Sequence, residues 1–230
     1  MFIFAMGYVF AHSVFDLYSS PSSKDFVKGL EEECEDVLAQ HHGLSTREAV
    51  ESLFRIDSAV RESMRISDVG VTTLPRDVIS DFVDLGDGVR IPPGVRMVFP
   101  TQSMHLDSRY HEDPLRYNAF RFSHKFEGQK QSQVEQRQHQ GEEPYKPQSD
   151  ERELLTSVGP SFLAFGYGRH ACPGRWFVAQ TIKQALAYVV SNYDVEMTGK
   201  PVQRKALLNM MVPPTGTQMR IRRKINKHVK

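Results

Sequence analysis

The sequence predicts a mainly α-helical chain with small β sheets, that is, an α+β fold. Apolar side chains recur at helical spacing through most of residues 1–66. Short runs of strand-forming residues, separated by glycine and proline turn signals, follow over residues 69–99. A second long apolar helical pattern occupies residues 173–192. At 230 residues the chain can form one domain or two small ones, and it is long enough to bury a core.

The charge balance and the cysteine count limit the classes of function. The chain has 29 lysines and arginines against 28 acidic residues, so as a whole it does not imply a polyanionic partner such as nucleic acid. Two cysteines do not make a disulfide framework, which fits a reducing compartment. Cys34 lies in an amphipathic helical pattern and is expected to face the core. The basic segment 220–230 is expected to be a solvated terminus.

The first element is predicted to be the end of a buried helix over residues 1–18. The first eleven residues are apolar, but this run is too short to span a bilayer and lacks the basic region of a signal peptide. We therefore expect no transmembrane anchor in this chain, with a short membrane anchor as the alternative. The serine-rich break at 19–23 supplies a cap, Ser22 or Ser23, for a second helix that continues through Leu38.

A third helix is predicted over residues 45–66, opened by a Ser-Thr-Arg-Glu capping box. Small β sheets are expected over 69–99, and a short helix near 102–106. Residues 123–153 are rich in Gln, Glu, Lys and His with almost no aliphatic side chains, so we expect a flexible, solvated insertion. Near the C-terminal end, a hairpin is predicted to pair residues 206–212 with 219–221.

The most informative segment is the loop at 165–174, directly before and overlapping the helix predicted over 173–192. Cys172 lies directly before the N-terminus of this helix. Pro173 falls at the first helical position, where the N–H that proline lacks would have no partner within the helix. The unpaired N–H groups and the positive dipole end of such a helix favour a thiolate. A buried structural cysteine is the alternative for Cys172 taken alone.

Four positions of this loop resemble the F-x-x-G-x-x-x-C-x-G haem-binding loop of the cytochrome P-450 family. They are Phe165, Gly168, Cys172 and Gly174. The two glycines are expected to allow turns and a close approach that a Cβ would block. The resemblance implies that Cys172 is the axial ligand of the iron of haem b. His170 falls where members place a residue toward a haem propionate, with an exposed loop histidine as the alternative.

A second group of residues resembles another signature of the same family. Glu62 and Arg65, three residues apart on a predicted helix, resemble its E-x-x-R pair. Arg121 lies in a Tyr-Asn-Ala-Phe-Arg-Phe run that resembles the family's aromatic-arginine segment as fungal members have it. The resemblance implies a buried cluster of one carboxylate and two guanidinium groups. Its role would be to fix the backbone behind the cysteine loop.

The resemblance implies a haem-thiolate monooxygenase that inserts one oxygen atom of O2 into a small lipophilic substrate, as in fungal secondary metabolism. Electrons would come from NADPH through a cytochrome P-450 reductase. Arg169 and Arg175 could form part of the basic surface for that partner, or they could be exposed arginines without a role. A full-length relative would lie at the endoplasmic reticulum membrane, with a cytoplasmic location as the alternative.

The resemblance covers the C-terminal half of the family's fold, and we expect the N-terminal half to be absent. Counting back from Asp16 places the family's acid–alcohol pair at Phe4 and Ala5, which can neither donate nor relay a proton. A truncated, non-catalytic fragment or pseudoenzyme is therefore the alternative interpretation. A third hypothesis is a non-catalytic binding module that uses the basic segment 220–230.

Overall fold

The computed structural model describes residues 2–67, 69–123, 153–199 and 203–225, and the side chains within them from Phe4 onward. Nearly all of the insertion expected at 123–153 lies outside the described residues, as do residues 226–230 of the basic segment. The described start of that segment, Arg220–Arg223, belongs to a strand and not to a free tail.

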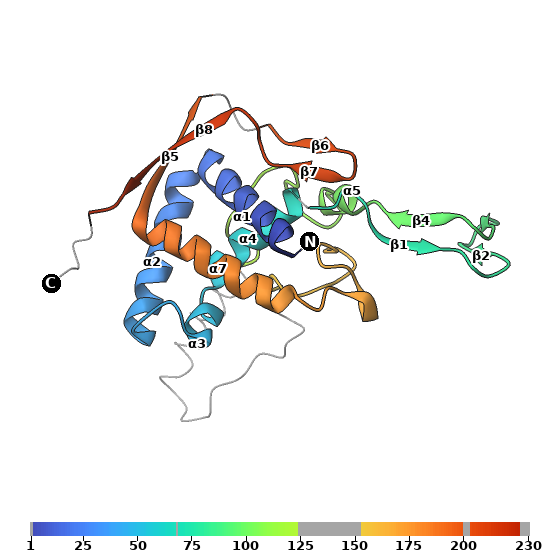
Figure 1. Cartoon of the computed structure of the whole chain (residues 1–230), viewed down its shortest axis with the longest axis horizontal. Helices are drawn as coiled ribbons and strands as arrows, with labels where there is room; N and C mark the ends of the chain where they lie inside the picture. Colours follow the sequence, from blue (N-terminus) through green and yellow to red (C-terminus); the bar gives the residue numbers. More distant parts are fainter. Residues whose placement is uncertain (1, 68, 124–152, 200–202, 226–230) are drawn as a thin grey trace.

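The helices form the body of the molecule, and short strands lie around it (Figure 1). The helices are α1 (Phe2–Ser19), α2 (Ser23–His41), α3 (Arg47–Glu51), α4 (Phe54–Ile66), α5 (Thr101–His105) and α7 (Arg175–Asn192), with a short 3-10 turn, η2 (Gly168–His170). The strands are β1 (Thr73–Asp77), β2 (Val83–Asp84), β3 (Arg90–Ile91), β4 (Arg96–Phe99), β5 (Tyr193–Gly199), β6 (Lys205–Leu207), β7 (Met210–Val212) and β8 (Thr217–Arg223). In the described residues the strands pair into two-stranded antiparallel sheets. The predicted class, helices with small sheets, is confirmed.

One apolar core joins the helices. α1 packs against α2, α4 and α7, and α7 also packs against α2, α3 and α4. The core side chains that solvent does not reach at all include Leu17, Leu30, Leu53, Ile56 and Leu186. Cys34 belongs to the same core, and its burial raises the pKa of the thiol to about 11. No helix in the described ranges has both the length and the hydrophobicity needed to cross a membrane.

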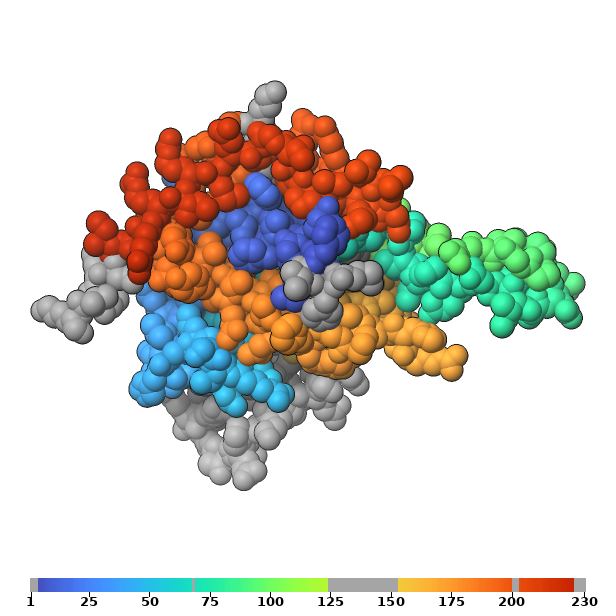
Figure 2. Space-filling model, viewed as in Figure 1, coloured from blue at the N-terminus to red at the C-terminus, as the bar shows by residue number. Residues whose placement is uncertain are grey.

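The sheets that contain β1 to β4 form an arm that projects from the helical body (Figures 1 and 2). β1 pairs with β4, and β2 pairs with β3 near the tip. Ile79 on this arm is 94% exposed and Leu85 61% exposed, so the arm has little core of its own. At its base it is joined to the β6–β7 hairpin, where the Asn209 carbonyl accepts from the Val71 N–H.

The helix predicted over 45–66 is two helices, α3 and α4. Thr46, and not Ser45, caps α3, because its Oγ1 accepts from the Ala49 N–H at 3.2 Å. Between the helices, the carboxylate of Glu33 on α2 accepts from the backbone N–H groups of Arg55 at 2.7 Å and Ile56 at 2.9 Å. In one continuous helix these N–H groups would bond to carbonyls four residues earlier. The Glu33 carboxylate replaces those carbonyls, and a new helix begins.

The predicted pairing of 206–212 with 219–221 is wrong. β6 turns back on β7, with Leu208 at a φ of 56° in the tight turn, while β8 pairs with β5 over seven residues. The longer pairing places Met219 opposite Met197 and Arg220 opposite Glu196, and the latter two form an ion pair at 2.8 Å. β5 follows α7 directly in the sequence, without a turn signal that would mark it as a separate strand, so it was not recognised as the partner of β8.

The helix after the cysteine also begins later than predicted. α7 starts at Arg175, and Gly174 takes the N-cap position. The first i→i−4 hydrogen bond joins Val178 N–H to the Gly174 carbonyl at 3.0 Å. Pro173 therefore belongs to the turn that precedes the helix and is not its first residue.

The Glu33 cap predicts a measurable contribution to stability. Glu33→Gln keeps the shape but removes the charge and one of the two acceptor oxygens, so we expect the free energy of unfolding to fall by about 1–2 kcal/mol in urea titrations. Glu32→Gln, at a neighbouring side chain that is 55% exposed, is the matched control, with an expected change below about 0.5 kcal/mol. Equal losses in the two variants would contradict the capping role.

Candidate functional site around Cys172

The loop that carries Cys172 closes on itself through backbone hydrogen bonds. Cys172 N–H donates to the Phe165 carbonyl at 2.7 Å, and Ala171 N–H donates to the Gly168 carbonyl at 3.0 Å. Gly166 and Gly168 have φ values of 76° and 64°, in the left-handed region that side chains other than glycine rarely adopt. Two glycines therefore permit the turn that returns the chain to Phe165.

Only one of the two glycines singled out in the sequence is required by the backbone. Gly168 has a positive φ, as expected. Gly174 has a φ of −85°, which any residue can adopt, so the expectation that its backbone needs glycine is wrong. Gly166, which the sequence argument did not use, takes that role instead.

Both backbone polar groups of Cys172 are hydrogen-bonded. Besides the N–H bond to Phe165, its carbonyl accepts from Arg175 Nη1 at 2.8 Å. Arg175 Nε donates to the Thr156 carbonyl at 3.2 Å, and the guanidinium lies 3.6 Å from the ring centroid of Trp176. The thiol of Cys172 is free of any disulfide, and the residue is half-buried. Arg175 is thus engaged with the backbone and is not a freely exposed basic group.

The other polar residues of the loop face solvent. Arg169 and His170 are both exposed, and Arg169 Nε lies 3.3 Å from His170 Nε2. Phe165, by contrast, is buried and belongs to the apolar core.

The structure brings Glu62, Arg65 and Arg121 together in the interior. Arg65 Nε and Nη2 donate to the two oxygens of the Glu62 carboxylate at 2.7 and 2.9 Å, which is a bidentate pair. Arg121 Nε lies 3.0 Å from both oxygens, and Asn118 N–H adds a further bond at 3.1 Å. Solvent reaches neither Glu62 nor Arg65.

The remaining guanidinium N–H groups of this cluster bind main-chain carbonyls. Arg65 Nη1 donates to the carbonyls of His105 and Pro114, both at 2.7 Å. The Nη groups of Arg121 donate to the carbonyls of Glu112, Asp113 and Arg116. Arg121 therefore binds the Glu62 carboxylate through Nε alone, and not as a second bidentate pair. Its terminal N–H groups hold the loop at 112–116.

His105 links this cluster to the segment before the cysteine loop. Its Nε2 accepts from the Leu163 N–H at 2.9 Å, and its ring stacks on Phe162 with centroids 5.2 Å apart. Burial, and then the positive charge of nearby groups that include Arg65, lower the pKa of His105 to about 3. The imidazole is neutral near pH 7, as an acceptor nitrogen must be.

The candidate proton-delivery position lies on the first turns of α1. Phe4 is 52% exposed, and its ring centroid lies 4.3 Å from that of Tyr8. Ala5 is half-buried. Neither side chain carries a group that can hold or transfer a proton.

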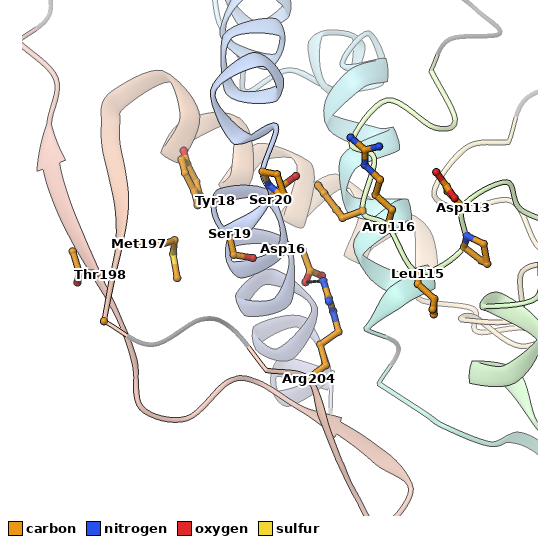
Figure 3. A pocket seen from close by; sticks show the side chains of 14 residues that line it. Asp16, Tyr18, Ser19, Ser20, Asp113, Leu115, Arg116, Met197, Thr198 and Arg204 are labelled. Carbon is orange, nitrogen blue, oxygen red and sulfur yellow. Dashed lines mark hydrogen bonds and ion pairs between the residues drawn. The ribbon is translucent and has the colours of Figure 1, made fainter.

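The far end of α1 lines an open pocket of about 780 Å³. Figure 3 shows Asp16 and Arg204 facing each other there, with Arg204 Nη2 donating to Asp16 Oδ1 at 2.6 Å. The other Asp16 oxygen accepts from Ser63 Oγ at 2.5 Å. The lining residues come from α1 and the two residues after it, the 113–117 segment, β5 and Arg204, and not from the cysteine loop. This pocket is therefore distinct from the Cys172 site.

Sequence reasoning missed three buried charged residues near the site. Asp57 and Arg61 are four residues apart on α4, and Lys183 on α7 pairs with Asp57 at 3.1 Å. The exposed fractions of the three residues are 5%, 3% and 5%. The i, i+4 spacing of Asp57 and Arg61 is the available signal, since it places both on one helix face.

The buried cluster predicts a large loss of stability when its charge balance is broken. Glu62→Gln leaves two guanidinium groups without a counter-ion, so we expect the free energy of unfolding to fall by about 3–5 kcal/mol in urea titrations. Glu51→Gln, the matched control, breaks the exposed Arg47–Glu51 pair and is expected to lower the free energy of unfolding by less than about 1 kcal/mol. A comparable loss in both variants would contradict a special role for the buried carboxylate.

The lowered pKa of His105 predicts a pH dependence of stability. In the pH range between about 3 and the usual value near 6.5, the unfolded chain binds a proton that the folded chain does not. The contribution of neutral His105 to the free energy of unfolding is therefore fully present above pH 6.5 and is lost as the pH falls toward 3.

The measurement is the free energy of unfolding across that range for the unmodified chain and for His105→Gln. The glutamine oxygen can accept from the Leu163 N–H but does not titrate. We expect a flatter profile in the variant, while parallel profiles would contradict the assignment.

Comparison with known proteins places the chain in a family. The family description "Cytochrome P450" matches residues 16–221. Cytochrome P450 monooxygenase gloP of Glarea lozoyensis is 36% identical over 222 residues, which are 93% of this chain and 38% of that protein. Cytochrome P450 monooxygenase htyF of Aspergillus rugulosus is 42% identical over 201 residues, which are 84% of this chain and 27% of that protein.

The similarity extends to further fungal proteins of the same description. Cytochrome P450 monooxygenase lnaC of Aspergillus flavus is 32% identical over 90% of this chain and 36% of its own length. The chain thus spans about a third of the length of these relatives, while the family match covers most of the chain itself. The chain belongs to the cytochrome P450 family.

Proposed function

We propose that Cys172 is the axial thiolate ligand of haem b iron and that this chain carries the proximal part of a haem-thiolate monooxygenase. The observation that supports this most is the anchoring of Cys172. Both its N–H and its carbonyl are held by hydrogen bonds, to Phe165 and from Arg175, while its thiol is half-buried at the core edge. A metal ligand needs this combination of a fixed backbone and an accessible donor atom.

The residues present fit such a group. Sulfur is a soft donor that suits haem iron, and the other cysteine, Cys34, is buried and its thiol pKa is raised to about 11, so it cannot compete. Gly168 takes the positive φ that the turn of the loop needs, and Phe165, whose carbonyl accepts from the Cys172 N–H, is buried in the apolar core. Gly174 ends the loop as the N-cap of α7. His170, which is exposed, is proposed to meet a haem propionate.

When bound, the thiolate-ligated haem would activate O2 for insertion of one oxygen atom into a small lipophilic substrate. In this chain Cys172 holds the iron, and the Glu62–Arg65–Arg121 cluster fixes the backbone behind the loop. Phe4 and Ala5 transfer no proton, so these two positions do not take part in proton delivery.

The finer assignments follow from the family and are proposals for this chain. Electrons are proposed to come from NADPH through a cytochrome P-450 reductase that docks on the cysteine side. Arg169 contributes to that surface, whereas Arg175 is mainly occupied by two carbonyls. A role in fungal secondary metabolism, at the endoplasmic reticulum membrane for a full-length relative, is proposed on the same basis.

Phe4 and Ala5 favour a second candidate, a chain without turnover. The acid–alcohol pair falls at these two positions, and neither side chain exchanges protons. This candidate shares haem binding through Cys172 with the first but not monooxygenation, so turnover, and not the spectrum, separates the two.

Replacement of the ligand tests the proposal directly. Purified chain loaded with haem should give a thiolate-type Soret band in the reduced, CO-bound spectrum, and Cys172→Ala should lose it, because alanine has no donor atom. Cys34→Ala is the matched control and should keep the band. A band that survives in Cys172→Ala would contradict the proposal, and a band without NADPH-dependent product formation in the presence of reductase would favour the second candidate.

A further inference from the structure

Two charged side chains of α4 that take no part in the Glu62 cluster hold the same short turn, residues 154–157. Asp57 Oδ1 accepts from the Leu155 N–H at 2.6 Å. Arg61 Nη1 donates to the carbonyls of Leu154 at 2.5 Å and Ser157 at 3.0 Å. The turn is closed by a bond from the Ser157 N–H to the Leu154 carbonyl at 2.9 Å. The buried face of α4 therefore binds both an N–H group and two carbonyls of this turn.

The opposite side of the turn is connected to the cysteine. The Thr156 carbonyl accepts from Arg175 Nε at 3.2 Å, and Arg175 Nη1 donates to the Cys172 carbonyl at 2.8 Å. One guanidinium thus bridges two carbonyls that lie 16 residues apart in the sequence. A continuous series of hydrogen bonds runs from Arg61, through the 154–157 turn and Arg175, to the backbone of Cys172.

The inner end of this series is held rigidly. The guanidinium carbon of Arg61 lies 3.8 Å from the ring centroid of Phe162 and 4.7 Å from that of Phe122. Burial lowers the pKa of Arg61 to about 10, so the side chain remains a cation at neutral pH. Asp57 pairs with Lys183, which ties the same face of α4 to α7. Contacts with two aromatic rings leave the guanidinium little freedom to move.

We propose that Arg61 and Arg175 form a brace that positions Cys172 relative to α4. Arg61 does not touch the thiol; it is a positioning residue that acts through the 154–157 turn and Arg175. The importance of the brace for iron ligation rests on the proposed function, in which Cys172 is the ligand. The brace itself is a property of the chain and can be measured without haem.

A double-mutant cycle read by hydrogen exchange tests the brace in the haem-free 230-residue chain. The variants are Arg61→Met, Arg175→Met and their combination, and the signal is the exchange rate of the Cys172 amide, which bonds to Phe165. We expect each single variant to raise this rate roughly tenfold, the effect of losing one charge-assisted hydrogen bond. If both residues act along one path, the Cys172 amide of the double variant should exchange at a rate within about twofold of that of the faster single variant.

Independent effects would overturn the proposal. If the two effects multiply to roughly a hundredfold, or if Arg61→Met leaves the Cys172 amide unchanged, Arg61 does not act through Arg175. Arg169→Met, an exposed arginine of the same loop, is the matched control and should leave the rate unchanged. Amides of α2 serve as the reference for global unfolding. If Arg61→Met does not fold, the same cycle with Arg61→Lys decides, because lysine keeps the charge but can bind only one carbonyl well.

The haem-loaded chain separates failure of the brace from failure of the proposed function. Arg61→Met and Arg175→Met should lower the fraction of thiolate-type Soret band in the CO-bound spectrum, while Arg169→Met should not. If Cys172→Ala keeps the band, the proposed ligand is wrong, and the exchange cycle still reports on the brace. If Cys172→Ala loses the band but neither brace variant changes it, the ligand assignment holds and the brace has no role in ligation.

Discussion

The burial of the Glu62 carboxylate is the constraint on which most of this structure depends. A carboxylate that solvent does not reach is stable only when its charge is balanced and its oxygens are bonded. Arg65 and Arg121 supply the balancing charge, and each then has further N–H groups that need acceptors of their own. These acceptors are backbone carbonyls between residues 105 and 116, so a segment without regular structure acquires a fixed path.

The same principle extends along α4 toward the cysteine. Asp57 and Arg61 are buried on the part of α4 that directly precedes Glu62, and they bind the backbone of the 154–157 turn. His105, whose carbonyl Arg65 holds, accepts from the Leu163 N–H at the entrance of the loop. α4 is therefore bonded directly to the 154–157 turn and indirectly, through His105, to Leu163, and the loss of such hydrogen bonds inside the core is costly. Buried charged residues and His105 thus hold, by hydrogen bonds, the segments that lead into the Cys172 loop.

Some of the site could be predicted from sequence, and the limits have physical reasons. The cysteine loop and the Glu62–Arg65 pair were found because their determinants are local: spacing on one helix, and glycines on one short loop. The role of Gly166 was missed because a positive φ cannot be read from a glycine in a glycine-rich run. Arg175 was taken for an exposed arginine because one of its acceptors, the Thr156 carbonyl, belongs to a turn 19 residues earlier.

The sequence by itself determined the class of fold, the family and the position of the cysteine loop, because hydrophobic periodicity and short motifs are properties of neighbouring residues. Tertiary structure decided the break between α3 and α4, the pairing of β5 with β8, and the tying of the cysteine loop to α4. Each of these depends on a partner distant in the sequence: Glu33 for the helix break, the strand after α7 for the sheet, and Arg61 for the turn. A backbone group takes whichever partner the fold brings to it, and that choice is made only when the distant segments pack.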